Sequence, residues 1–284
     1  MFRRTYGGLP AVLGVAALLV AAGGVLRTGS GAESQGEEEM PSVEEIVERA
    51  NEVAYYQAGT GRARVKLTIM DARGRKRGEK ELIILRRNAE EGLDQKFYAY
   101  ILRPADVRRT VFLVWKHIES DDDRWLYSPG LDLVNRIAAT DKRTSFIGSH
   151  FLYEDVSGRS IADDEHELVQ VTDDYFVLKN TPKDADLVEF SYYQMYIHRE
   201  TFLPTAAYYY DKNGEKYREY QVLSMKQVDG YWTATKTVMR DLRERDTAVA
   251  HTVAEYSDIQ YGIELPEDIF TERYLRKAPR EYLK

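Results

Sequence analysis

The chain has 284 residues, 43% of them hydrophobic and 31% charged, with a formal net charge of −7 at pH 7. This balance allows a buried core and excludes a disordered polymer, and the acidic charge argues against nucleic acid as a partner. The absence of cysteine excludes disulfide bonds, thiolate metal ligands, a cysteine nucleophile and a lipid attached to an N-terminal cysteine.

The first residues have the features of an export signal. Arginines at positions 3 and 4 precede an uncharged run over residues 9–26, and small residues up to Ala32 fit a cleavage site. Residues 1–32 are therefore predicted to be a signal peptide, whose removal would take the net charge from −7 to −10 because it contains three arginines. An uncleaved anchor is the alternative, although the run is short for a spanning helix and contains proline and glycine.

An acidic linker over residues 33–41 precedes one amphipathic helix predicted over 42–57. Ser42 is the expected N-cap, with Glu45 three residues later. Apolar residues then recur at spacings of three and four, which places them on one face. This stripe should pack against the rest of the fold, and it consists of Val43, Ile46, Val47, Ala50 and Val53.

From residue 62 onward the apolar residues alternate with a period of two, which is typical of half-buried strands. Residues 62–71 and 79–87 are expected to form a hairpin around the turn at 71–78. The remaining strand candidates, separated by turn-forming residues, are 95–102, 110–118, 123–128, 133–137, 166–171, 175–181, 188–199, 205–211, 216–225, 231–242 and 252–261.

The order of these elements favours a mainly β protein of the α+β class. No Gly-rich phosphate-binding motif interrupts the strands and no helix alternates with them, so a doubly wound or TIM-type fold is not expected. An antiparallel sheet of about ten strands must curl or split to protect its edges. We expect residues 42–284 to form one domain, with the leading helix covering one side or mouth of the sheet.

The residues that could carry chemistry do not form a recognisable catalytic set. Ser149, His150 and Asp155 suggest a hydrolase triad, but adjacent side chains diverge and no G-x-S-x-G motif is present. The five histidines form no metal-binding pair, and the acidic clusters at 120–125 and 162–167 fit turns better than a calcium loop. No catalytic residue, metal or cofactor is therefore predicted, although paired carboxylates for glycoside hydrolysis are left open because only their distance is diagnostic.

An aromatic set between positions 115 and 153 is more informative. As a group, these side chains could line or gate a concave apolar pocket, because ligand pockets are mostly apolar. For any one of them, ordinary core packing explains its presence equally well. The candidate lipid-binding residues are Trp115, Trp125, Tyr127, Phe146, Phe151 and Tyr153.

The stretch 123–156 carries a family resemblance. It has Trp125, Tyr127 and Pro129 as W-x-Y-x-P, then Arg136 and Ile137, and then a segment of the form F-x-G-S-x-F-x-Y-E-D over residues 146–155. This pattern resembles the LolA-like family of outer-membrane lipoprotein-sorting proteins. The signal peptide, leading helix and strand series match the layout of that family, while His150 departs from it.

The resemblance implies a half-open antiparallel β-barrel of ten or eleven strands, with a helical lid over an apolar cavity. It implies a non-enzymatic periplasmic carrier, a lipoprotein chaperone whose partners are a lipid or a lipidated protein and an inner-membrane transporter. Two alternatives stay open: a hydrolase acting on envelope lipids or glycans, and a scaffold that docks on an inner-membrane lipid exporter. In the family segment, Gly148 is expected to permit a bend, while Ser149 and Asp155 satisfy backbone groups.

Overall fold

The computed structural model of the protein describes residues 40–284 except positions 91 and 93 and the side chain of Arg245. The predicted signal peptide and all but the last two residues of the predicted linker lie outside the described residues. Pro41–Lys284 form one compact unit.

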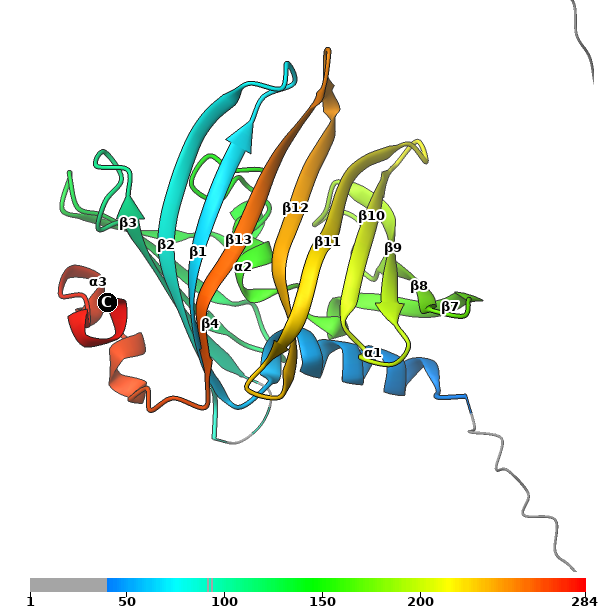
Figure 1. Cartoon of the computed structure of the whole chain (residues 1–284), viewed down its shortest axis with the longest axis horizontal. Coiled ribbons are helices and arrows are strands. Elements are labelled where there is room, and N and C mark those ends of the chain that lie inside the picture. The colour runs from blue at the N-terminus through cyan, green and yellow to red at the C-terminus, as the bar shows by residue number, and fades with distance from the viewer. Residues whose placement is uncertain (1–39, 91, 93) are drawn as a thin grey trace, which may run out of the picture. The chain divides into compact units, whose positions relative to one another are not determined.

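One antiparallel sheet dominates this unit (Figure 1). Among the described residues it contains thirteen strands, in the order β6-β5-β4-β3-β2-β1-β13-β12-β11-β10-β9-β8-β7. The strands are β1 (Thr60–Met70), β2 (Lys76–Asn88), β3 (Gln95–Arg103), β4 (Val111–Lys116), β5 (Asp123–Ser128), β6 (Leu133–Ile137), β7 (Asp164–Val171), β8 (Tyr175–Pro182), β9 (Phe190–His198), β10 (Pro204–Asp211), β11 (Lys216–Val228), β12 (Tyr231–Arg245) and β13 (Val249–Tyr261).

The expected total of ten or eleven strands is therefore wrong for this chain. Every segment named as a strand candidate contains a strand, including the short and mostly exposed β6. A mainly β fold with an open sheet is confirmed, and β6 and β7 are the two edges of that sheet.

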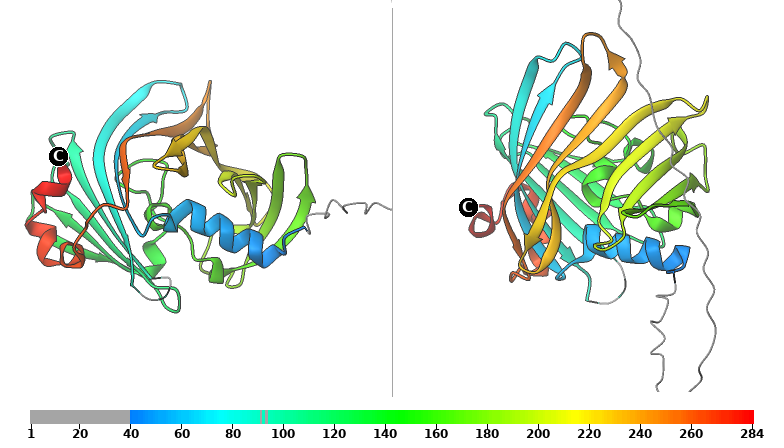
Figure 2. Two further views of the ribbon diagram at one scale, coloured as in Figure 1. Left: turned by 60° about the horizontal axis from the view of Figure 1, so that its bottom comes forward. Right: turned by 45° about the vertical axis from the view of Figure 1, so that its right-hand side comes forward.

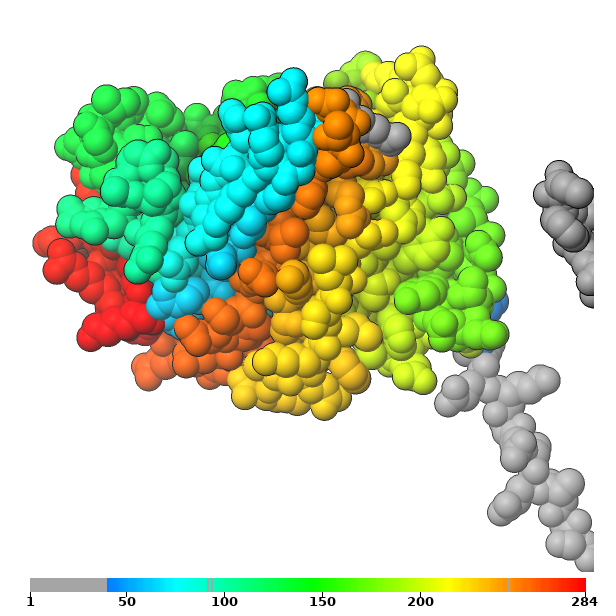
Figure 3. Space-filling model, turned by 45° about the horizontal axis from the view of Figure 1, so that its top comes forward, coloured from blue at the N-terminus to red at the C-terminus, as the bar shows by residue number. Residues whose placement is uncertain are grey.

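The centre of the sheet joins two meanders. β1 pairs with β2 on one side and with β13 on the other, so that β1–β6 and β7–β13 form a continuous surface. Figure 3 shows this order on the outside of the molecule, where β2, β1, β13, β12 and β11 run side by side. A sheet of this width twists and curls because neighbouring strands are rotated relative to one another.

The leading helix α1 (Val43–Asn51) continues into a turn of π-helix, η1 (Glu52–Tyr56). The predicted N-cap is confirmed, because the Ser42 side chain accepts a hydrogen bond of 3.1 Å from the Glu45 N–H. The predicted stripe is confirmed as well. Ile46, Val47 and Ala50 are buried against side chains of β8 and β9, and Val43 and Val53 pack on the same cluster.

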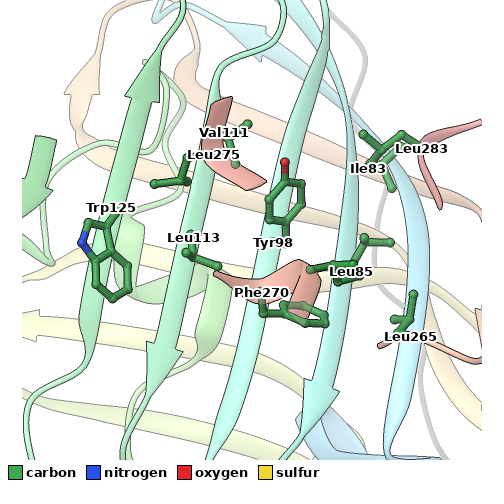
Figure 4. Close-up of a cluster of buried hydrophobic side chains, with 11 residues drawn as sticks. Ile83, Leu85, Tyr98, Val111, Leu113, Trp125, Leu265, Phe270, Leu275 and Leu283 are labelled. Carbon is green, nitrogen blue, oxygen red and sulfur yellow. The ribbon is translucent and has the colours of Figure 1, made fainter. Parts of the chain in front are cut away.

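The C-terminal segment covers the outer face of β2–β5 (Figures 1 and 4). It contains η4 (Glu267–Phe270), α3 (Arg273–Arg276) and η5 (Arg280–Leu283). Its apolar side chains, including Phe270 and Leu275, pack between Leu85, Tyr98 and Leu113 of the sheet. These strands are consequently buried on both faces and read as nearly continuous apolar runs.

Phe270 should be essential to this packing. Its side chain is fully buried, so Phe270→Ala is expected to lower the free energy of unfolding by about 3–5 kcal/mol, through lost burial and the cavity left behind. Urea unfolding of the two proteins measures the difference. Leu131→Ala is the matched control, because Leu131 is 78% exposed and should change stability by less than about 0.5 kcal/mol. Equal effects of the two substitutions would contradict this account of the C-terminal segment.

Candidate functional site

A cavity of about 390 Å³ lies against the concave face of the sheet. Residues of α1 and η1 line it on one side, and the connection between β6 and β7 lines it on another. Figure 2 shows α1 lying across the open side of the curved sheet. Most of the lining is apolar, and the sheet side chains that contribute include Val65, Leu67, Leu82, Ile84, Phe97 and Met239.

The connection between the two edge strands, residues 138–163, is called here the bridging segment. It contains η2 (Ala139–Asp141), α2 (Tyr153–Ser157) and η3 (Ile161–Asp163). Toward β3 and β4 it is held by aromatic packing. The ring of Phe112 lies 5.5 Å from that of Phe146 and 5.0 Å from that of Tyr153, measured between centroids. The segment thus covers part of the apolar concave face.

Toward the other half of the sheet, the bridging segment is held by buried ion pairs centred on Glu154. Its side chain is only 4% exposed and lies 2.5 Å from the guanidinium of Arg143 and 3.3 Å from that of Arg159. Arg143 also binds Glu189, just before β9, at 2.6 Å. Arg159 donates to both carboxylate oxygens of Asp164 at the start of β7. These pairs connect the segment to the β7–β13 meander.

The charges around Glu154 decide its protonation. Burial alone would raise the pKa of Glu154, but the positive charges of Arg143, Arg159 and Lys142 outweigh burial and lower it. The same competition acts on Glu189, where burial opposes the hydrogen bond and charge of Arg143 and the pKa falls to about 2. Both carboxylates are therefore ionised at neutral pH, and the network is fully charged.

Residues 146–152 form a compact turn, in which Ser149 and His150, two of the residues that suggested a triad, make structural contacts. Gly148 has a φ of +71°, so the expected bend is confirmed. Ser149 Oγ donates to the carbonyl of Phe146 at 2.8 Å and accepts from the N–H of Phe151 at 3.2 Å. His150 Nδ1 lies 2.8 Å from the Thr252 hydroxyl.

Asp155, the third residue of the suggested triad, also makes local structural contacts. Asp155 Oδ2 accepts the N–H of Leu152 at 2.6 Å and pairs with Arg218 of β11. Within the described residues, the side chains of Ser149, His150 and Asp155 make no hydrogen bond with one another. The predicted backbone-satisfying roles of Ser149 and Asp155 are confirmed.

The six aromatic candidates separate into two groups. Phe146 and Phe151 line the cavity. Tyr153 belongs to the same apolar cluster of the concave face, where it packs against Phe112.

Trp115, Trp125 and Tyr127 lie on the opposite face of the sheet, in the cluster that the C-terminal segment covers. The indole N–H of Trp115 donates to the carbonyl of Phe270 at 2.6 Å. The structure therefore places these three away from the cavity, and they are not carried into the proposed site.

Sequence reasoning missed the polar lining of the cavity. Tyr55 of η1, Tyr209 of β10, Tyr220 of β11 and Tyr256 of β13 all face it. They come from distant parts of the chain and from runs such as "AYYYD", where every second residue points outward. Only the period-two alternation with Ala207 could have marked Tyr209 as inward-facing.

The described part of the chain shows no group of three or more His, Asp or Glu side chains placed to hold a metal ion. In the same residues, no helix combines the length and the apolar character needed to cross a membrane.

Removing the central carboxylate should weaken the network strongly. Glu154→Gln would leave Arg143 and Arg159 with fewer counter-charges in a buried site, so we expect the free energy of unfolding to fall by about 3–5 kcal/mol. Urea unfolding at pH 7 measures this. Glu167→Gln is the control, since Glu167 is 68% exposed and its carboxylate lies 4.0 Å from Lys179; its effect should stay below about 0.5 kcal/mol. Similar losses in both variants would contradict the role given to Glu154.

The contribution of the Glu154 ion pairs to the free energy of unfolding should depend on pH. Because the folded-state pKa of Glu154 lies below its ordinary value of 4.5, its contribution is complete above pH 4.5 and is lost as the pH falls through the folded pKa. The difference in unfolding free energy between wild type and Glu154→Gln should therefore shrink as the pH is lowered below 4.5. Urea unfolding between pH 7 and pH 2 checks this, and a difference that does not change with pH would count against it.

The comparisons with known proteins agree with this architecture. A family model described as "-like: Uncharacterized protein" matches residues 93–277, and a search of curated proteins gave no match. The chain is similar to the crystal structure of a DUF1329 family protein from Desulfovibrio piger, with 26% identity and a TM-score of 0.73, over 81% of this chain and 96% of that one.

Two further crystal structures carry descriptions that name a related group. A protein from Vibrio parahaemolyticus, described as an outer membrane lipoprotein-sorting protein domain, is 25% identical with a TM-score of 0.73, over 82% of this chain and 97% of that one. A LolA superfamily protein from Nitrosomonas europaea shares the fold at 19% identity and a TM-score of 0.64, over 83% of this chain and 100% of that one. The matched family model spans more than half of the chain, so the chain belongs to that family, and its predicted resemblance to the LolA-like outer-membrane lipoprotein-sorting proteins is confirmed.

Proposed function

We propose that this protein is a periplasmic carrier. It holds a lipid, or the acyl chains of a lipoprotein, in its cavity and transfers them between envelope membranes without covalent chemistry. The observation that supports this best is the apolar cavity of about 390 Å³ on the concave face of the sheet, a volume within the usual range for ligand pockets of about 300–1,000 Å³. Export by a signal peptide over residues 1–32 belongs to the same proposal.

The energetics of acyl-chain burial suit such a task. Each methylene group that moves from water into an apolar site contributes about 0.8 kcal/mol, so a chain of moderate length binds without a covalent bond or a metal. The lining supplies this apolar surface through sheet residues such as Val65, Leu82 and Phe97, and through Phe146 and Phe151 of the bridging segment. Phe146 and Phe151 are the two predicted aromatic residues that we retain as acyl-chain contacts.

The helix α1 and the turn η1 are the proposed lid. Arg86 of β2 fastens the end of this lid, because its guanidinium donates to the carbonyls of Tyr55 and Gln57. Burial lowers the pKa of Arg86 to about 10, which leaves it charged at neutral pH. Release of cargo would require the lid to move to a state that binds cargo less well.

The hydrolase alternative has less support. A catalytic carboxylate or nucleophile needs a group that is free to react with substrate. The carboxylates that line the cavity are Glu154 and Asp155, and each is paired with arginine. No specific contact favours the scaffold alternative over the carrier.

Filling the cavity with a larger side chain should weaken cargo binding. Ala63 lies on the cavity side of β1, so Ala63→Trp is expected to weaken binding of a fluorescent fatty acid at least about tenfold, by occupying the space that the acyl chain needs. Fluorescence titration of the purified protein measures the affinity.

The control is Lys66→Trp, at an exposed position on the other face of the same strand, which should bind as wild type does. Lipid mass spectrometry after purification without detergent gives an independent readout. A wild-type protein that repeatedly carries no lipid and takes up no fluorescent fatty acid would exclude the proposed function.

A further inference from the structure

One end of the cavity is polar. Tyr55, Tyr209 and Tyr220 belong to its lining, and none of their three hydroxyls has a hydrogen-bond partner among the residues that the structure describes. Buried tyrosine hydroxyls usually find a partner, because an unpaired polar group in an apolar site is unfavourable. Three such groups on one cavity wall are therefore available to a ligand.

These hydroxyls gather around the bridging segment. The ring of Tyr55 lies so close to Gly158 that a methyl group at that position would overlap it. The Tyr209 ring stacks on that of Tyr193 at 5.0 Å between centroids, and the Arg218 guanidinium lies 5.2 Å from the Tyr209 centroid. Arg218 in turn pairs with Asp155. The polar end of the cavity thus lies beside residues 155–158.

The phenols are hydrogen-bond donors at neutral pH. Burial, and after it the negative charge of Asp155 and neighbouring tyrosines, raises the pKa of Tyr55 and Tyr220. Burial raises the pKa of Tyr209 to about 12, against the opposing charge of Arg218. A ligand atom that meets these hydroxyls should therefore be a hydrogen-bond acceptor.

The charges nearby disfavour an anionic ligand group. Arg218 is paired with Asp155, and Arg159 with Asp164 and Glu154. Arg86, elsewhere in the lining, gives its N–H groups to backbone carbonyls and Asn88. The charge of Arg218 is balanced by Asp155, although its Nη1 is a buried donor without a partner among the described residues. A carboxylate or phosphate at the tyrosine end would lose its hydration and lie beside Asp155, which is costly, whereas an uncharged acceptor could meet the same N–H without this cost.

We propose that the cargo is a lipid with an uncharged, hydrogen-bonding polar group, such as the ester carbonyl of a neutral acylglycerol, and that Tyr55, Tyr209 and Tyr220 bind this group. The apolar chain then extends along the wall formed by Phe97, Phe146 and Phe151. This inference rests on the proposed carrier function and adds the chemical class of the cargo to it.

Three lipids with the same oleoyl chain separate the possibilities: monoolein, oleate and 1-oleoyl lysophosphatidic acid. Each competes with a fluorescent fatty acid for the full-length protein, below its micelle concentration. Monoolein is expected to displace the probe at a concentration at least about tenfold lower than either anionic lipid, because it can accept the phenol hydrogen bonds without burying a charge.

The double variant Tyr209→Phe with Tyr220→Phe removes two donors and little volume. It should lose about tenfold in affinity for monoolein while its affinity for oleate stays unchanged. Each single variant should lose part of the affinity for monoolein, and the single variants provide the readout if the double variant does not fold. Tyr210→Phe is the matched control: Tyr210 adjoins Tyr209 in β10, and its hydroxyl bonds to Gln194 at 3.4 Å. It should bind all three lipids as wild type does.

The outcomes separate this inference from the carrier function. Equal binding of oleate and monoolein by the wild type, or an unchanged preference in the tyrosine variants, would overturn the neutral-lipid proposal and leave the carrier intact. Failure of all three lipids to displace the probe, together with purification free of lipid, would overturn both.

Discussion

An open sheet of thirteen strands curls because its strands twist, and its concave face and edges then need cover from other parts of the chain. β6 and β7 are unpaired edges at opposite ends of the strand order, and the bridging segment is the covalent connection between them. Glu154 is the centre of this arrangement, because the arginines that it binds reach Asp164 at one edge and Glu189 beside β9. These buried pairs hold the bridging segment to the β7–β13 side of the sheet, where Glu154, Asp155 and Arg159 line part of the cavity.

Two parts of the chain cover the apolar concave face, and they leave a cavity between them. The bridging segment packs aromatic rings against Phe112 of β4 and the apolar cluster around it, and α1 packs mainly on the β8–β9 side. Between these two contacts, inward side chains of β1 and β2 such as Val65, Leu67 and Leu82 belong both to this apolar cluster and to the cavity wall. The C-terminal segment covers the opposite face of β2–β5, so these strands are buried on the side away from the cavity.

Local periodicity predicted the positions of the helix and the strands well. It did not predict which face of each strand points toward the concave side of the sheet. The 3.6-residue stripe of α1 and the period-two strands are properties of neighbouring residues and could be read directly. In "TVFLVW" both faces are apolar, so alternation could not show that Phe112 belongs to the concave face while Trp115 lies under Phe270. The partner of Trp115 lies 155 residues later in the chain. The pairing of Arg143 with Glu189 depends in the same way on tertiary structure that no local pattern contains.

The position of Asp155 connects the shape of the sheet to the proposed cargo. Asp155 follows Glu154 in α2, binds Arg218 of β11 and lines the cavity beside the unpaired tyrosine hydroxyls. A polar group bound by these hydroxyls would contact the same segment that ties the edges of the sheet together. Tyr55 belongs to η1, which is part of the proposed lid. Movement of that lid would take the Tyr55 hydroxyl away from the cargo, so the closed arrangement would bind cargo more tightly than an opened one. That difference in affinity is what a carrier needs in order to couple opening with release.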